Sequence, residues 1–296
     1  MSGARPARAL EVLRPGALTT VQDAGRPGYA HLGVPRSGAL DAAAYALANR
    51  LVGNPPEAAV LETTLDGVGL RAGSGGAVTV AVTGAPCAVR VAGRPVAWGA
   101  PVRVPAGAEL EVGRAESGVR SYVAVRGGLT VPPVLGSRST DLLSGLGPAV
   151  PPGGTVLPVG PAGPDPVCGA DVLPVPGAPA ELVLPLRLGP RADWFGPASL
   201  AALWRAAYRV SPASNRIGLR TEAGAPLARA RAGELPSEGM VLGAVQVPPD
   251  GLPVVFLADH PVTGGYPVVG VVPPGAALDA AAQARPGVPV RFVPSR

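Results

Sequence analysis

The stretch Gly243-Ala244-Val245-Gln246-Val247-Pro248-Pro249-Asp250-Gly251 and the run Val254-Val255-Phe256-Leu257 that follows it decide the fold class. Each contains a short aliphatic run bounded by glycine or proline, which is the pattern of a buried strand that ends in a turn. Two more polar segments flank this pair, namely Ser237-Glu238-Gly239 and Thr263-Gly264-Gly265-Tyr266-Pro267. The polar segments are then loops at strand ends, where a sheet holds binding groups still and leaves them accessible.

The side chains of these loops are suited to binding a ligand. Gln246 and Tyr266 both donate and accept hydrogen bonds, and Thr263 adds a hydroxyl. Gly264 and Gly265 have no Cβ, so the backbone there can approach a ligand closely. The alternative interpretation is a set of tight turns with Tyr266 packed in the core.

The composition favours a folded, turn-rich β protein. Glycine (42) and proline (38) together exceed a quarter of the 296 residues, but 47% of the residues are hydrophobic and can form a core. Short apolar runs separated by turns continue outward from the opening stretch, and their spacing fits a barrel or a sandwich. The runs are Val78–Val82, Ala88–Val91, Val102–Val104, Glu109–Val112 and Val119–Val125.

All 25 basic residues are arginine, and the sequence contains no lysine. This excludes a Schiff-base lysine, a biotinylated lysine and the lysine of a phosphate-binding loop on this chain. The net charge of +5 is spread over dispersed arginines, and aromatic residues make up only 4%, so nucleic-acid binding is not favoured.

Cysteine and histidine are too sparse and too scattered for a metal site. Cys87 and Cys168 lie far from each other and from both histidines, and we expect them to be small buried hydrophobic residues. The first residues lack a signal-peptide core, and no apolar run has membrane-spanning length. We therefore expect a cytoplasmic protein with no metal and no membrane contact.

Two helices and one linker organise the chain. Leu40, Ala44, Leu47 and Leu51 recur at helical spacing after Ser37, the expected N-cap, and Gly53 ends this helix. A second helix is expected at about residues 197–207. Residues 148–180 are rich in proline and glycine with little periodicity. We expect three parts, which are an N-terminal β-rich unit over 1–160, a linker or crossover over 161–180 and a C-terminal β unit over 181–296.

Two arginine-bearing loops are candidate anion sites. Arg26 follows Asp23 in a glycine-rich turn, and its planar guanidinium suits a carboxylate or carbonate; the alternative is that the two residues tie the turn together. Arg216 lies in Asn215-Arg216-Ile217-Gly218 after the second helix, where a helix exit closed by polar residues is the alternative.

A third candidate anion site is Ser137-Arg138-Ser139-Thr140, which combines hydroxyls, a cation and a preceding glycine. It lacks the Gly-Lys-Ser/Thr core of a phosphate loop. Its amides and hydroxyls can still bind an oxyanion or a phosphate, and a turn closed by Asp141 is the alternative. Asp259 and His260 precede Thr263, but no Gly-x-Ser-x-Gly elbow supports a serine hydrolase.

Taken in this order, the motifs resemble the biotin-dependent carboxyltransferase family, also called allophanate hydrolase subunit 2. Its free-standing members include the C subunit of the ATP-dependent 5-oxoprolinase. The resemblance covers most of the chain, from about residue 10 to 293. It rests on Val21-Gln22-Asp23-Ala24-Gly25-Arg26, Ser37-Gly38-Ala39-Leu40-Asp41, Ala48-Asn49-Arg50-Leu51-Val52-Gly53-Asn54, Leu61-Glu62-Thr63-Thr64, Gly127-Gly128, Leu135-Gly136-Ser137-Arg138-Ser139-Thr140, Asn215-Arg216-Ile217-Gly218-Leu219-Arg220, Ser237-Glu238-Gly239, Gln246-Val247-Pro248-Pro249-Asp250-Gly251 and Thr263-Gly264-Gly265-Tyr266-Pro267.

The resemblance implies a mainly β fold of two cyclophilin-like β-barrel units with a few short helices. It also implies two partner proteins, the B subunit (of the allophanate hydrolase subunit 1 type) and the A subunit. The complex of the three would open 5-oxoproline to glutamate, with ATP and Mg bound through the complex. Biotin is not expected on this chain. Two alternatives stay open, namely the carboxyltransferase component of a biotin-dependent urea or amide carboxylase and a non-catalytic regulator that binds a B-type mate.

The site expected from the loops and the resemblance together has two parts. Tyr266, Gln246 and Asp259 are expected to act in catalysis. The residues expected to bind substrate are Thr263, Gly264, Gly265, Arg26, Arg216 and Glu238.

Overall fold

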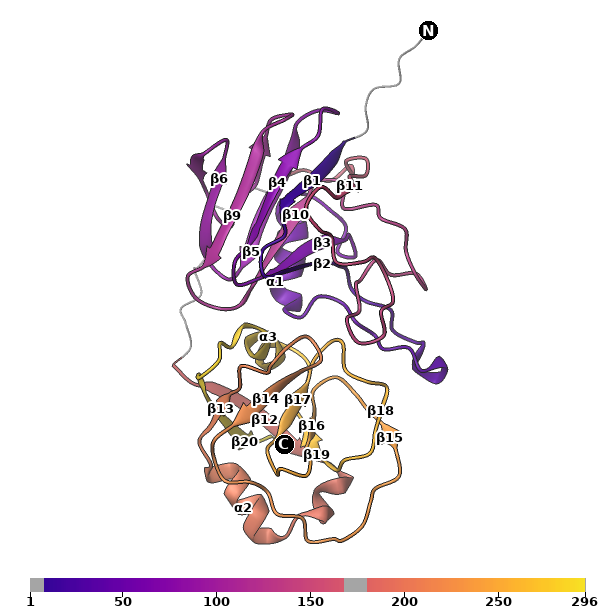
Figure 1. Ribbon diagram of the computed structural model, residues 1–296, viewed down its shortest axis with the longest axis vertical. Helices are drawn as coiled ribbons and strands as arrows, with labels where there is room; N and C mark the ends of the chain where they lie inside the picture. The colour runs from indigo at the N-terminus through magenta and orange to yellow at the C-terminus, as the bar shows by residue number, and fades with distance from the viewer. Residues whose placement is uncertain (1–7, 168–179, 296) are drawn as a thin grey trace. The chain divides into compact units, whose positions relative to one another are not determined.

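The computed structural model describes residues 8–167 and 180–295, and the chain forms two units (Figure 1). Unit 1 comprises residues 1–26, 41–140 and 145–178, and unit 2 comprises residues 27–40, 141–144 and 179–296. Unit 2 therefore includes two short segments that lie far upstream of its main part in the sequence. The predicted linker over 161–180 falls largely on residues 168–179, which lie outside the described residues.

Unit 1 is built on two antiparallel sheets. One has the strand order β11-β1-β4-β9-β6-β7 and the other β2-β3-β10-β5-β8. One hydrophobic cluster, which includes Val12, Leu70, Val80 and Val123, takes residues from both sheets, so the two sheets face each other across a shared core. The strands are β1 (Ala9–Arg14), β2 (Leu18–Gln22), β3 (Val60–Thr64), β4 (Val68–Ala72), β5 (Val78–Gly84), β6 (Cys87–Val91), β7 (Arg94–Val96), β8 (Val102–Val104), β9 (Glu109–Ala115), β10 (Arg120–Val125) and β11 (Val156–Pro158).

Burial along these strands follows their place in the sheets. In β6 every second residue is buried, as expected for a strand with one face in the core and one in solvent. All six residues of β10 are buried, because the second face of its sheet contacts helix α1 (Ala42–Leu51). The apolar run from Tyr122 to Val125 in the sequence reflects this double cover.

Helix α1 begins later than its sequence pattern predicts. The N-cap is Asp41, whose carboxylate accepts a hydrogen bond from the Ala44 amide at 2.9 Å, so the prediction of Ser37 as the cap is wrong. Ser37 instead has a positive φ of 50° in the loop before the helix and uses its hydroxyl elsewhere. The predicted end is confirmed, because the helix stops at Leu51 and Gly53 follows in the left-handed region with φ of 66°.

Unit 2 is a closed seven-stranded barrel with the order β12-β19-β16-β17-β14-β13-β20. The barrel closes through β12 and β20, which run parallel to each other while the other pairs are antiparallel. Its core contains Tyr208 and Phe292, whose rings meet edge to face at 5.8 Å, and Leu40 from the upstream segment. The strands are β12 (Leu182–Leu188), β13 (Tyr208–Val210), β14 (Gly218–Glu222), β16 (Ala244–Gln246), β17 (Val254–Phe256), β19 (Val268–Val271) and β20 (Pro289–Pro294).

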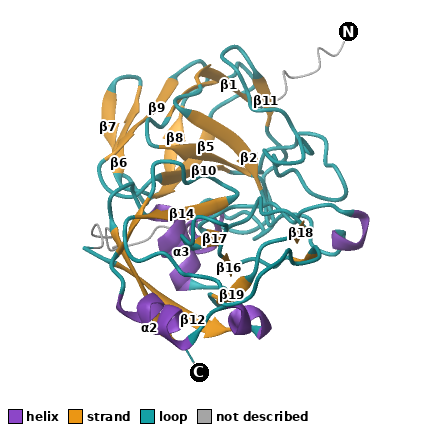
Figure 2. Cartoon of the chain, turned by 60° about the horizontal axis from the view of Figure 1, so that its bottom comes forward, coloured by secondary structure: helices purple, strands orange, loops and turns teal. Residues whose placement is uncertain are grey.

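The remaining elements of unit 2 surround the barrel. Helix α2 (Pro197–Arg205) lies against β20 and buries Leu203, which confirms the second predicted helix. Helix α3 (Ala276–Gln283), which was not predicted from the sequence, lies against β12. A two-stranded ribbon of β15 (Glu238–Gly239) and β18 (Thr263–Gly264) stands apart from the barrel sheet, and Figure 2 shows β18 set between long loops. Two short 3-10 helices, η1 (Ala30–Leu32) and η2 (Pro190–Trp194), complete the unit.

The mainly β class, the barrel and the few short helices are confirmed. The strands of unit 1 take the sandwich arrangement, which was one of the two that their spacing fits. The predicted bounds of the three parts, 1–160, 161–180 and 181–296, stay a prediction.

Candidate functional site

The ribbon of β15 and β18 brings the three polar loops of the C-terminal region together in space. Glu238 pairs with Gly264, and Gly239 pairs with Thr263. Gln246 reaches this ribbon from the end of β16, where its buried side-chain Nε2 donates to the Tyr266 carbonyl at 3.2 Å. The loops at the strand ends therefore meet at one place, as the sequence predicts.

Gly264 makes room for this close approach. A Cβ at position 264 would lie 2.7 Å from Gln246 Nε2 and 3.3 Å from the Met240 methyl carbon. Any side chain there would displace Gln246 or Met240. At Gly265 the nearest atom to a Cβ would be the Leu235 carbonyl oxygen at 3.5 Å, so this position has ordinary room.

Tyr266 does not pack in the core. The residue is 44% exposed, so the interpretation of Tyr266 as a buried core residue is wrong. The Arg229 guanidinium carbon lies 5.7 Å from the centre of its ring, within the range of a cation–π contact. The phenol is therefore held by its ring and remains accessible to a ligand.

Glu238 is committed to an arginine. The Arg191 Nε donates to both carboxylate oxygens at 2.8 and 3.0 Å, and Arg191 Nη2 donates to Oε1 as well. The hydrogen bond from Arg191 lowers the pKa of Glu238 below its usual value. Glu238 is about one-third exposed, so a substrate can still reach its edge.

Asp259 and Arg216 form a second, fully buried cluster in unit 2. Arg216 donates to both carboxylate oxygens of Asp259, from Nε at 2.9 Å and from Nη2 at 3.0 Å. Ser37 Oγ donates to the same carboxylate at 2.8 Å, and Arg216 Nη2 also donates to the Gly38 carbonyl at 2.7 Å. The cluster ties the upstream segment 27–40 to the barrel. These contacts give Asp259 and Arg216 a structural role, and their predicted catalytic and substrate-binding roles stay predictions.

A third cluster, in unit 1, holds the loop predicted to bind an oxyanion. The hydroxyls of Ser137 and Ser139 donate to the Asp23 carboxylate at 2.6 and 2.7 Å. Arg26 is buried against the same loop, where Nη2 donates to the Ser139 carbonyl. Asp23 therefore bonds to the hydroxyls rather than pairing with Arg26 around the turn.

The remaining groups of this loop are also in use. Thr140 Oγ1 donates to the Pro148 carbonyl at 2.9 Å, and Arg138 Nε donates to the Val131 carbonyl at 2.8 Å. Binding of an oxyanion or a phosphate at this loop stays a prediction.

Three residues next to the ribbon were not found from the sequence, namely Arg191, Arg229 and Met240. Each lies outside the polar motifs, and Arg191 and Arg229 contact residues that are far away in the sequence. The partner of Arg191 is 47 residues away, for example. In the sequence, only the alternation of small polar loops with aliphatic runs indicates the site. That pattern does not include these three residues.

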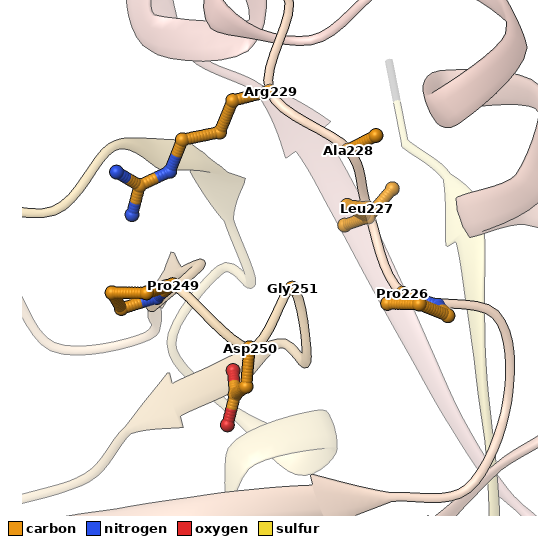
Figure 3. Close-up of a pocket in the computed structure, with 7 residues that line it drawn as sticks. All are labelled: Pro226, Leu227, Ala228, Arg229, Pro249, Asp250 and Gly251. Atoms are coloured by element: carbon orange, nitrogen blue, oxygen red, sulfur yellow. The ribbon is translucent and has the colours of Figure 1, made fainter. Parts of the chain in front are cut away.

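A pocket of about 440 Å³ opens beside Arg229, lined by Pro226, Leu227, Ala228, Arg229, Pro249, Asp250 and Gly251 (Figure 3). Two loops form it, one after β14 and one between β16 and β17. They are joined where the Leu227 amide donates to the Gly251 carbonyl at 2.9 Å.

Within residues 8–167 and 180–295, no group of three or more histidine, cysteine, aspartate or glutamate side chains can hold a metal ion. The same part of the chain contains no helix with the length and apolar character that crossing a bilayer requires. Cys87 is buried, as predicted, and Cys168 lies outside the described residues.

The model of the family described as "Carboxyltransferase domain, subdomain A and B" matches residues 32–294 of the sequence. The chain belongs to the carboxyltransferase domain family. Among its relatives, this carboxyltransferase-domain protein is 39% identical to the C subunit of 5-oxoprolinase from Escherichia coli, and the match covers 96% of this chain and 90% of the relative. It is 32% identical to the corresponding 5-oxoprolinase chain of Haemophilus influenzae, with the same two shares covered.

Solved structures of the family have the same fold. The urea carboxylase of Kluyveromyces lactis matches 99% of this carboxyltransferase-domain chain with a TM-score of 0.90 and 32% identity. The chain spans only 28% of the length of that larger protein. The predicted family resemblance is thus confirmed.

Proposed function

We propose that this chain is the C subunit of an ATP-dependent 5-oxoprolinase, a hydrolase complex that opens the lactam of 5-oxoproline to give glutamate. The observation that carries the proposal is the 39% identity to the Escherichia coli C subunit along nearly the whole of both chains. A relative matched from end to end supports a shared role better than one matched by a single domain. The complex would also contain partner chains of the A and B types.

The loops at the ribbon supply the amide-binding groups of the proposed site. A lactam presents one acceptor oxygen and one N–H donor on adjacent edges, which a side-chain amide and a backbone N–H can satisfy together. Gln246 and the Gly264–Gly265 backbone have these groups. The exposed phenol of Tyr266 would donate to the lactam oxygen, where negative charge develops when the carbonyl is attacked.

ATP and Mg would bind elsewhere in the complex. This chain has no lysine, and the loop with the most hydroxyls is centred on the Asp23 carboxylate. No step of the chemistry proposed for this chain therefore involves the nucleotide directly.

The test is reconstitution with partner chains of the two types. This chain is co-purified with them, and glutamate formed from 5-oxoproline is measured with ATP present, with ATP omitted and with this chain omitted. We expect glutamate only in the complete mixture. A complex that assembles and forms no glutamate would contradict the proposal and favour a non-catalytic, partner-binding role.

A second candidate is the carboxyltransferase component of a biotin-dependent amide carboxylase, because the urea carboxylase structure matches with a TM-score of 0.90. In that case the activity would need a biotin carboxylase and a biotinylated carrier, and avidin would abolish it. Activity that avidin does not change supports the 5-oxoprolinase.

A further inference from the structure

The pocket beside the ribbon has one charged group that is free to bind a ligand. Arg229 forms one end of the pocket, and Figure 3 shows its side chain extending past Pro249. Asp250 also lines the pocket, but its Oδ1 accepts the Leu252 amide at 3.0 Å, and in Figure 3 its carboxylate points away from Arg229. The guanidinium is therefore the positively charged group of the pocket.

The charge of Arg229 is not matched by a carboxylate among the described residues. Its one hydrogen bond there runs from Nη2 to the Val247 carbonyl at 3.1 Å, and Nε is buried without a partner. Nearby arginines differ, since Arg191 pairs with Glu238 and Arg231 with Asp193. A half-buried guanidinium with unused N–H donors is a strong binder of planar anions, because the fork matches a carboxylate in shape and charge.

Arg229 is also held in place. Its backbone forms a β-bridge with Phe195, and the next amide, of Ala230, donates to the Trp194 carbonyl at 2.7 Å. The guanidinium is fixed from the other side by the Tyr266 ring. A cation held on several sides loses little conformational freedom when it binds an anion.

The position of Arg229 links the pocket to the proposed amide site. One of its contacts is Tyr266, and the other is Val247, the neighbour of Gln246. Pro226, Leu227 and Pro249 give the pocket apolar walls, which suit the carbon skeleton of a small ring. The volume of about 440 Å³ is within the usual range of small-molecule sites, roughly 300–1,000 Å³.

We propose that this pocket binds the carboxylate of a small cyclic acid and that Arg229 is the residue that holds it. The proposal rests on the proposed function, because 5-oxoproline is such an acid and its lactam would then face Gln246 and Tyr266. Tyr266 would have a second role, as the group that positions the guanidinium.

The test compares two substrates and three variants in the reconstituted complex. The substrates are 5-oxoproline and 5-oxoprolinamide, which lacks only the carboxylate charge. The variants are Arg229→Gln, Arg229→Lys and the control Arg231→Gln, which removes the same charge two residues away, from an arginine that is 52% exposed. The Michaelis constant, kcat and melting temperature are measured for each.

We expect Arg229→Gln to raise the KM for 5-oxoproline about ten- to a hundredfold with kcat little changed, because it removes binding that ground state and transition state share. Arg229→Lys keeps the charge without the planar fork, so its KM should lie between the values of the wild type and of Arg229→Gln. The wild-type complex should bind 5-oxoprolinamide about as weakly as the Gln variant binds 5-oxoproline. Arg231→Gln should behave as wild type.

Two outcomes would overturn the assignment. One is an unchanged KM for 5-oxoproline in a folded Arg229→Gln variant. The other is equal affinity of the wild-type complex for the acid and its carboxamide, which needs no variant and holds even if the substitution unfolds the chain. In both cases turnover of 5-oxoproline continues, so the proposed function survives.

If the complex does not turn over 5-oxoproline, a binding measurement on this chain separates the two ideas. Saturation-transfer NMR with 5-oxoproline, and with its carboxamide as control, reports binding without turnover. A signal for the acid that is lost in Arg229→Gln supports the pocket while the proposed function fails. No signal for the acid would overturn the pocket as well.

Discussion

Tyr266 is 44% exposed, and its ring is held by Arg229, so two kinds of substitution at the proposed site give different results. Tyr266→Phe keeps the ring and removes the donor. We expect turnover by the reconstituted complex to fall about a hundredfold, or about 3 kcal/mol in the transition state, with little change in melting temperature.

Gln246→Ala is the companion variant. It removes the bond to the Tyr266 carbonyl and leaves a gap, so turnover should fall and the melting temperature should fall slightly as well. The same preparations are assayed for glutamate and melted. If both variants turn over substrate like the wild type, the amide site lies elsewhere.

His260 predicts a dependence of stability on pH. The residue is 6% exposed, and its ring stacks on Phe256 with centroids 6.1 Å apart. Burial lowers the pKa of His260 below its ordinary value of 6.5, and the charge of Arg36 adds to this, while Asp259 and Asp141 oppose it. Below that ordinary value the unfolded chain binds a proton that the folded chain does not.

The folded state should therefore lose stability as the pH falls from about 6.5 through the lower folded pKa of His260. Thermal melts between about pH 7 and pH 5 measure this loss. His260→Gln should flatten the slope, while the control His31→Gln, at an exposed histidine, should keep it. An equal slope in the wild type and in His260→Gln would assign the effect to other groups.

At the level of the element, the start of α1 is the position where sequence and structure differ most clearly. Asp41 accepts the Ala44 amide, and its own amide donates to the Tyr122 hydroxyl at 2.8 Å. Asp41→Ala should reduce the free energy of unfolding by about 1 kcal/mol, as measured by urea denaturation. Asp41→Asn retains a capping oxygen and is the matched control. Equal losses in the two variants would mean that the charge, and not the cap, is what matters.

The reason for the wrong cap is physical. Ser37 and Asp41 are both good capping residues, and local propensity does not rank them. What separates them is the carboxylate of Asp259, which lies 222 residues downstream of Ser37 and takes its hydroxyl. The strands were easier to predict, because runs such as Val102–Val104 show burial and turns locally, and this run matches β8 at both ends.

The candidate site was predicted only in part, because local patterns are visible in the sequence and long-range contacts are not. Gln246 and Tyr266 lie at strand ends that the hydrophobic pattern marks, and they meet as expected. Arg229 lies in an exposed stretch without periodicity, and its position is set by contact with the ring of Tyr266, 37 residues further along the chain. Helix α3 was missed because Ala276–Gln283 is short and follows a proline-rich turn that favours a loop.

At the level of the whole molecule, the division of unit 2 among three segments leads to a prediction about truncation. A fragment of residues 180–296 lacks Ser37 and Gly38, which bond to Asp259 and Arg216. It would leave a buried ion pair without part of its hydrogen bonding and would also lose Leu40 from the core. We expect this fragment to melt without a cooperative transition.

The measurement is circular dichroism during heating, with the full chain as reference. Ser37→Ala in the full chain removes one of these bonds alone and should lower the free energy of unfolding by about 1–3 kcal/mol. A fragment that melts cooperatively near the temperature of the full chain would show that residues 27–40 are not part of the folding unit.

The same tie between Ser37 and Asp259 sets a delay during biosynthesis. The two residues are separated by 222 positions, which a ribosome that adds about 5–20 residues per second takes roughly ten to forty seconds to produce. Throughout that time the loop carrying Ser37 has been made but the Asp259 carboxylate has not, and strands β3 to β10 are completed and can pair before Asp259 is made. The nascent chain therefore lacks the partner of this loop until Asp259 has been synthesised, and a product that stops before that residue leaves the loop open to chaperones and proteases.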